Sequence, residues 1–292
     1  MLAALVDRAG IELSTVDSAL GRWTHAAWRP AAGEPLAGLV EHIWYFEGTL
    51  AHAWETVFPT GTLELIVQLD EPHRPAGRSE RYPQLALTGM QTTALTVEAP
   101  QGRCRVLGVR VHPAAAYALL GHSFAPAVGA TIDLCDVAGR SAQELGERCA
   151  AARGAAARVA AAIDWTEARL GRAREVAPYV AYAAARIERA GGDTAIAVLQ
   201  RELGIPDKRF VAAFREQIGV VPKRYARIVR FRRTLALIDS GAGSLADIAG
   251  AVGYYDQAHM SAEFAAHAGR SPTAYLAALR YPGSSSLAAD PF

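Results

Sequence analysis

With 292 residues, 51% of them hydrophobic, and a net charge of +1, the chain is long enough for two packed domains. Its three cysteines, Cys104, Cys135 and Cys149, are far apart and odd in number, which argues against a disulfide framework and fits a reducing cytoplasm. No apolar run approaches the roughly 18 residues of a membrane span, and no secretory signal is recognisable, so we expect a cytoplasmic protein without a membrane partner.

The first part of the chain predicts a mixture of strands and helices. Leu63, Leu65, Val67 and Leu69 alternate with other residues, which is the period of a strand buried mostly on one face. The segment CRVLGVRV at 104–111 predicts a second strand, and Pro113 then opens a short helix that ends near Leu120. Residues 74–83 are polar and rich in loop formers, which indicates a surface loop.

From about Asp136 onward the pattern becomes helical. Alanine-rich stretches carry arginines at helical spacing, and Gly154, Gly171 and the Gly191-Gly192 pair mark helix ends. The predicted organisation is an N-terminal domain over 1–160, a linker over 161–175, a C-terminal helical domain over 176–281 and a flexible tail over 282–292.

The net charge hides an uneven distribution. From Gly171 onward there are 16 Lys and Arg against 11 Asp and Glu, whereas the preceding residues hold 14 against 18. The excess is greatest between Arg201 and Arg233, with ten basic and three acidic residues. This asymmetry favours a C-terminal domain that faces a polyanion, although charge runs are often only solvated faces.

An internal repeat of about 50 residues lies in this basic region. The later members of each copy are 50 positions apart: Phe214, Gly219, Pro222 and Tyr225 recur as Phe264, Gly269, Pro272 and Tyr275. The earlier members are 49 positions apart: Leu203-Gly204 and Asp207 recur as Val252-Gly253 and Asp256. The extra residue is therefore expected between the turn and the following helix. Two copies are too few for a solenoid and fit a duplicated supersecondary unit.

Each copy predicts a helix, a tight turn at glycine and a second helix. In the first copy the side chain of Asp207 is expected to cap the second helix, with Phe210 and Phe214 on its inward face. Met260 and Phe264 take the inward positions of the second copy. In such a helix-turn-helix unit the first helix braces the second, whose early residues enter the major groove of DNA.

A single helix from Pro222 to about Asp239 joins the two units. About 17 residues at 1.5 Å each give roughly 26 Å of rigid spacing. This length can place two recognition helices about one DNA turn apart, near 34 Å, on the same side of a duplex.

The arrangement closely resembles the AraC/XylS family of transcription regulators over roughly Val176 to Arg280. The second half carries the more specific motifs, LADIAGAVGYYDQAHMSAEF followed by GRSPTAYL. By resemblance, the residues that face base edges are Lys208, Val211, Ala212, Gln257, Ala258, His259 and Ala262.

The sequence departs from the family at Ala212 and Ala262, where relatives often carry polar side chains. An alanine cannot hydrogen-bond to a base, although its methyl group can touch a thymine methyl. Base reading then depends on Lys208, suited to guanine, on Gln257, suited to adenine, and on His259, unless His259 is a partly buried structural residue.

The remaining conspicuous side chains of this region divide into backbone contacts and core residues. We assign Arg209, Arg215, Arg224 and Arg227 to DNA phosphates or to structural pairing. Two tyrosines that repeat with the fold, Tyr225 and Tyr275, fit either the core or the DNA surface.

The N-terminal part is similar to a sensor domain that accompanies this DNA-binding module in many bacterial regulators. The similarity rests on WYFEG at 44–48, FPTGTLELIV at 58–67 and VLGVRVHPAAAYALLG at 106–121. It implies an α+β chain: a small β-barrel-like domain with helices, followed by an all-α domain with two helix-turn-helix units. Such domains bind an effector, a partner protein or a second copy of the chain.

Polar residues in otherwise apolar strands are candidates for an effector pocket, although they also fit the solvent face of a sheet. They are Trp44, Glu64, Arg110, His112 and Tyr117. The spacing of His42, His52 and His112 matches no metal-ligand pattern, so we expect no metal and no cofactor.

The main hypothesis is therefore an activator or repressor of transcription that binds double-stranded DNA, with RNA polymerase as a further partner if it activates. A DNA-targeted enzyme resembling alkylation-repair proteins is the alternative. Its zinc site would need a cluster of thiolates, and the chain has no Cys-x-x-Cys, no Gly-rich phosphate loop and no Gly-x-Ser-x-Gly. We therefore predict a protein that is not an enzyme.

Overall fold

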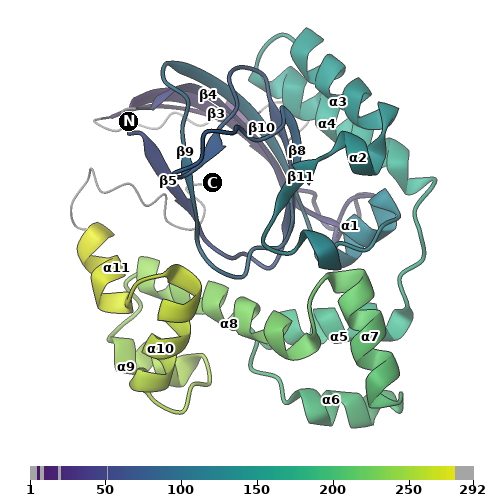
Figure 1. Ribbon diagram of the computed structural model, residues 1–292, viewed down its shortest axis with the longest axis vertical. Coiled ribbons are helices and arrows are strands. Elements are labelled where there is room, and N and C mark those ends of the chain that lie inside the picture. Colours follow the sequence, from purple (N-terminus) through teal and green to yellow (C-terminus); the bar gives the residue numbers. More distant parts are fainter. Residues whose placement is uncertain (1–4, 7–9, 19–20, 51, 280–292) are drawn as a thin grey trace.

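The computed structural model describes residues 5–6, 10–18, 21–50 and 52–279. A β-rich domain comes first in the chain and a helical domain follows, and the two lie against each other (Figure 1). The fold is therefore α+β, as the sequence predicts. No helix in the described part of the chain combines the length and apolarity needed to cross a lipid bilayer.

The larger sheet of the β-rich domain is antiparallel, with the strand order β1-β2-β3-β4-β10-β6-β8-β11. Its strands are β1 (Leu5–Val6), β2 (Glu12–Ser18), β3 (Gly21–Trp28), β4 (Val40–Leu50), β6 (Leu63–Gln68), β8 (Leu85–Thr88), β10 (Arg103–Val111) and β11 (Thr131–Asp133). The smaller sheet has the order β5-β9-β7, with β5 (Trp54–Val57), β9 (Leu95–Glu98) and β7 (Arg74–Pro75).

The two central strands, β6 and β10, are those that the sequence predicts. In β6, Leu63, Leu65 and Val67 are buried in the main core, as predicted, and β10 pairs with β6 in register from Val106 to Val111. The loop predicted over 74–83 is mostly irregular, but its first two residues form β7 against β9.

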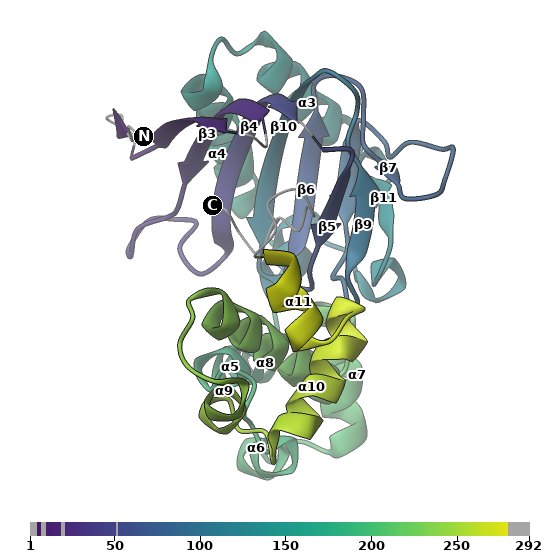
Figure 2. The same ribbon diagram turned by 90° about the vertical axis from the view of Figure 1, so that its left-hand side faces the viewer.

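The larger sheet curls so that the smaller sheet faces its inner side (Figures 1 and 2). The two hydrogen-bonded sheets remain separate, so the domain is barrel-like without being a closed barrel. A small apolar cluster of Phe46, Cys104 and Val106, with Trp23 and Trp44 packed against it, lies on the sheet next to this space.

Helices cover the outer side of the larger sheet. They are α2 (Cys135–Ala138), α3 (Arg140–Ala151) and α4 (Ala155–Leu170), while α1 (Pro113–Leu120) and the short turn η1 (Ala125–Ala127) lie toward the helical domain. Arg158 of α4 is buried and donates a hydrogen bond to the Tyr45 hydroxyl (3.1 Å), which fastens the helix to β4. Residues 161–170, part of the predicted linker, form the second half of α4 and pack on the sheet.

The helical domain begins after an irregular connection over residues 171–177. Its helices are α5 (Pro178–Arg189), α6 (Ile196–Leu203), α7 (Asp207–Ile218), α8 (Pro222–Asp239), α9 (Leu245–Ala251), α10 (Gln257–Ala268) and α11 (Pro272–Leu279). The predicted tail over 282–292 lies outside the described residues.

Helix α8 takes part in both cores of the helical domain. Its first half, through Tyr225, Ile228 and Val229, packs with α5, α6 and α7, and its second half, through Phe231 and Leu235, packs with α9, α10 and α11. Although α8 is rich in arginine, its buried apolar residues therefore join the two cores of the helical domain.

Candidate nucleic-acid interface

Two helix-turn-helix units stand at the ends of α8, as the sequence predicts. The first consists of α6 and α7 and the second of α9 and α10. Gly204 and Gly253, the glycines of the two turns, have φ angles of +62° and +76°, a region that glycine adopts without strain.

The starts of the two second helices differ in their caps. Asp256 caps α10, because its Oδ1 accepts a hydrogen bond from the backbone N–H of His259 (2.7 Å). The expected cap at Asp207 is wrong: Pro206 is the capping residue of α7, and Asp207 is already in its first turn. One residue separates Gly204 from the cap Pro206 and two separate Gly253 from the cap Asp256, so the extra residue falls where the repeat predicts it.

The inward faces of α7 and α10 are fully buried. Phe210, Phe214, Met260 and Phe264 each have zero exposure, so their structural assignment is confirmed. The two tyrosines also belong to the core: Tyr225 is 1% exposed and Tyr275 is 0% exposed. These side chains fix the orientation of both second helices.

The outward faces carry most of the residues expected to meet base edges. Exposed among them are Lys208, Ala212, Gln257, Ala258, His259 and Ala262. Val211 is only half-buried and packs against the first helical core, so its side chain is the least available of the set. His259 is exposed rather than partly buried, although its ring meets the edge of Tyr254 at 5.3 Å.

The two second helices begin on the same side of the molecule. In Figures 1 and 2 both α7 and α10 start at the end farthest from the β-rich domain and run toward it. The 18 residues of α8 between the units correspond to a rod of about 27 Å. Two exposed helix starts on one side, held by a rigid spacer, match what adjacent turns of a major groove require.

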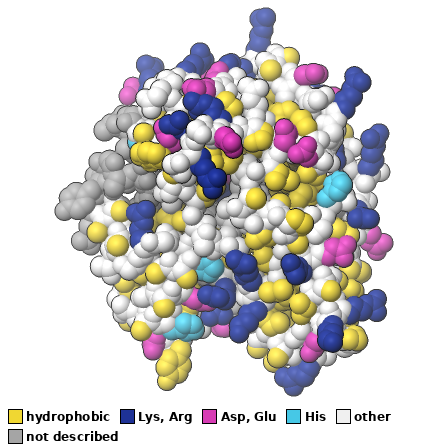
Figure 3. Space-filling model, viewed as in Figure 1, with side chains coloured by type: hydrophobic (Ala, Val, Ile, Leu, Met, Phe, Trp, Pro, Cys, Tyr) yellow, Lys and Arg dark blue, Asp and Glu magenta, His cyan; other side chains and the backbone are white. Residues whose placement is uncertain are grey.

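Basic side chains border this surface. Of the ten Lys and Arg residues between Arg201 and Arg233, all but Arg230 and Arg232 are exposed. Figure 3 shows several Lys and Arg side chains together in the lower half of the molecule, over the helical domain. A cluster of this kind supplies electrostatic affinity for a polyanion.

The four arginines assigned to the DNA backbone fall into two pairs. Arg209 and Arg215 are exposed on α7. Arg224 instead donates a hydrogen bond to Thr92 Oγ1 of the β-rich domain (2.8 Å), and Arg227 forms an ion pair with the buried Glu263. The second pair is therefore occupied by contacts within the protein.

Sequence reasoning missed Tyr255, the most exposed large hydrophobic side chain described, at 93%. It lies in the turn between α9 and α10, one residue before the cap Asp256, whereas its neighbour Tyr254 is buried. The signal was present in the repeat, because the second copy has its extra residue between Gly253 and Asp256, and Tyr255 lies in that segment.

The β-rich domain contacts the far ends of both second helices. In the last turn of α10, His267 accepts a hydrogen bond at its carbonyl oxygen from the Ala94 N–H (2.6 Å), and its Nδ1 lies 2.7 Å from the Thr92 carbonyl oxygen. Beyond the end of α7, Gly219 lies against Phe124 and Val128. The two domains are thus joined at the ends of the helices that would enter DNA.

The structure brings together three of the five candidate pocket residues. The Trp44 indole donates a hydrogen bond to Glu64 Oε1 (2.7 Å), and Arg110 forms an ion pair with Glu64 at 3.4 Å. Glu64 also lines a cavity of about 120 Å³ between the two sheets. His112 and Tyr117 lie elsewhere: His112 faces Glu188 of the helical domain at 3.6 Å, and Tyr117 is buried in α1.

Two histidines near the polar group of the sheet have strongly lowered pKa values. Burial, with a smaller effect of Arg29, lowers the pKa of His25 to about 4. Burial, followed by the charges of Arg110, Arg29 and His25, lowers the pKa of His42 to about 3. Both side chains are therefore neutral at physiological pH.

Comparison with known proteins finds two matching families. Residues 199–278 match the Helix-turn-helix domain family, and residues 29–133 match a domain of unknown function, DUF6597. No curated protein matches the chain.

Solved structures with similarity to the chain include the C-terminal domain of AraT, a response regulator from Geobacillus stearothermophilus. It is 21% identical, with a TM-score of 0.34, and the match covers 36% of this chain and 88% of that one. ToxT from Vibrio cholerae is 10% identical, with a TM-score of 0.43, over 77% of this chain and 98% of that one. ToxT bound to (E)-4-(8-methylnaphthalen-1-yl)but-3-enoic acid is 11% identical, with a TM-score of 0.44 and the same coverage.

Proposed function

We propose that the chain is a DNA-binding transcription regulator of the AraC/XylS type, which binds specific duplex sites under the control of its β-rich domain; the match of residues 199–278 to the Helix-turn-helix domain family supports this. The observation that carries the proposal is the pair of exposed helix starts on one side of the helical domain, separated by α8. We propose no catalytic activity.

Within this proposal, the exposed residues of α7 and α10 read bases. Lys208 offers donors to guanine, the amide of Gln257 can pair with adenine, and His259 follows two positions after Gln257 in the first turn of α10. Ala212, Ala258 and Ala262 permit a close approach and can contact thymine methyl groups. Val211, being half-buried, contributes through the packing of α7.

Contacts with the DNA backbone would come from the arginines and from Tyr255. Arg209 and Arg215 are exposed and available for phosphates. Arg224 and Arg227 would reach phosphates only after exchanging their present partners, Thr92 and Glu263. Tyr255 protrudes next to the reading face, where its hydroxyl could donate to a phosphate and its ring could pack on a sugar.

Control by the β-rich domain is proposed from its contacts at His267 and Gly219. An effector near Trp44, Glu64 and Arg110, or a second copy of the chain, could change how the two domains dock and so how α7 and α10 are presented. Contact with RNA polymerase is proposed only for the case in which the protein activates transcription. The domain boundary in this scheme lies in the irregular connection over 171–177.

A selection from random duplexes with the full chain tests the proposal. We expect an enriched site with two elements about 10 base pairs apart, bound with an affinity that falls steeply as salt rises. Sequence-independent binding alone, at salt near 0.15 M, would overturn the regulator proposal. Sedimentation of the same sample shows whether a second copy takes part.

A further inference from the structure

A cavity of about 420 Å³ lies between the two domains. Alanines from two facing helices form much of its wall: Ala114, Ala115 and Ala118 on α1, and Ala181, Ala184 and Ala185 on α5. The space exists because these short side chains cannot fill the gap between the helices. Its volume is within the range of small-molecule sites.

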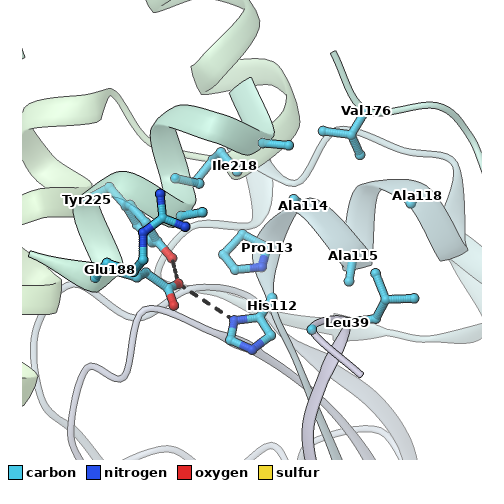
Figure 4. A pocket seen from close by; sticks show the side chains of 15 residues that line it. Leu39, His112, Pro113, Ala114, Ala115, Ala118, Val176, Glu188, Ile218 and Tyr225 are labelled. Atoms are coloured by element: carbon cyan, nitrogen blue, oxygen red, sulfur yellow. Dashed lines mark hydrogen bonds and ion pairs between the residues drawn. The ribbon is translucent and has the colours of Figure 1, made fainter. Parts of the chain in front are cut away.

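Polar groups occupy one side of the cavity. Figure 4 shows Glu188 with Tyr225 and His112 on that side, and Leu39, Ala118 and Val176 on the other. The cavity is thus amphipathic, with a wide apolar part and one polar part. A ligand that fits it needs an apolar body and a single polar head.

The carboxylate of Glu188 determines which head is favoured. Its Oε1 accepts a hydrogen bond from the Tyr225 hydroxyl and lies 3.6 Å from His112 Nδ1. Burial alone would raise the pKa of Glu188, but the hydrogen bonds of His112 and Tyr225 prevail and lower it. The group is therefore ionised at neutral pH and can only accept hydrogen bonds.

We propose that this interdomain cavity binds a small amine with an apolar body, whose ammonium group pairs with the Glu188 carboxylate and whose body packs on the alanines. An ammonium group donates hydrogen bonds to a carboxylate and carries the opposite charge, so the two form a charge-assisted pair. Because helices of both domains form the walls, the ligand favours the docked arrangement of the domains.

A ligand with an acidic head is the main competitor. Arg189 also lines the cavity, but it is exposed to solvent, and a carboxylate placed at the polar side would lie beside Glu188. Repulsion between two carboxylates disfavours that placement. Ligands that share one apolar chain and differ only in the polar group therefore distinguish an amine site from a carboxylate site.

Calorimetric titration of the full chain with octylamine, octanol and octanoate makes that comparison. We expect octylamine to bind at least ten-fold more tightly than either of the other two. Glu188→Gln, which keeps an oxygen acceptor for Tyr225, should remove most of this preference, whereas Glu147→Gln on the exposed surface of α3 should not. Ala185→Leu, which fills the cavity without removing a charge, should weaken all three ligands.

Equal affinity for the three heads, preference for octanoate, or absence of binding to the wild-type chain would overturn the proposal. So would octylamine binding that survives both Glu188→Gln and Ala185→Leu. The effect of octylamine on DNA affinity rests on the proposed function and is measured separately with the selected duplex. Failure of DNA binding leaves the calorimetric result intact, so the two proposals fail independently.

Discussion

Arg224 on α8 donates its hydrogen bond to Thr92 Oγ1, a partner 132 positions away in the other domain. The same threonine offers its carbonyl oxygen to His267 of α10 at 2.7 Å. Thr92 therefore contacts both the helix that spaces the two reading units and the end of one recognition helix. An arginine expected at a phosphate is held, in this arrangement, by the domain proposed to control DNA binding.

Substitutions at the two ends of this contact should affect DNA binding differently. Arg224→Ala is expected to weaken binding to all duplexes alike and to reduce the slope of log affinity against log salt by about 0.9, because one phosphate contact is lost. Thr92→Val releases Arg224 and should leave affinity unchanged or higher. Titrations of both variants at several salt concentrations check this, and a sequence-selective loss in Arg224→Ala would contradict the phosphate assignment.

Single substitutions of Lys208 and Gln257 should each reduce the base preference at one position of the DNA site. Lys208→Ala and Gln257→Ala are each expected to relax base preference by about 1–3 kcal/mol at one position of the site. Both side chains are exposed, so the fold should survive either change. Competition between the selected duplex and its single-base variants measures the effect, and uniform weakening across all variants would assign these residues to the backbone instead.

Tyr255 should matter for DNA affinity although no packing requires it. Tyr255→Ala is expected to cost about 1–2 kcal/mol of binding, and Tyr255→Phe less, because the phenylalanine lacks only a hydrogen bond to phosphate. Tyr182→Ala, at a tyrosine that is 45% exposed on α5, is the matched control and should bind normally. Equal affinity of Tyr255→Ala and the wild type would remove Tyr255 from the interface.

The helical domain could be predicted largely from sequence because its signals are local. Phe210 and Phe214 are four positions apart, as are Met260 and Phe264 in the second copy. Residues at this spacing lie on the same face of a helix, so they are neighbours in space whatever the rest of the chain does. The turn glycines and the length of α8 follow from the same repeat. Only the cap of α7, at Pro206 rather than Asp207, departed from the pattern.

The contacts between elements distant in sequence could not be predicted. Glu64 and Arg110 meet because β6 and β10 pair with these two residues opposite each other, and this register is not visible in the sequence of either strand. His112 follows an irregularity between Arg110 and Val111 and precedes α1, so it faces the helical domain and not the group at Glu64. The alternation of residues along the strands therefore could not show that Glu64 and Arg110 lie in one group while His112 lies in another.

The β-rich domain should lose stability as the medium becomes mildly acidic. His25 and His42 have folded-state pKa values of about 4 and about 3, below the usual 6.5, so between these limits the unfolded chain binds protons that the folded chain does not. The free energy of unfolding should therefore be unaffected above pH 7 and fall below 6.5, by up to about 1.4 kcal/mol per pH unit for each histidine. Urea unfolding at pH 7.5, 6 and 5 measures this slope. His42→Gln should reduce the slope by the contribution of one histidine, while His25, together with His73 and His267, whose pKa values burial also lowers, keeps the remainder. An unchanged slope would show that His42 does not contribute to acid stability.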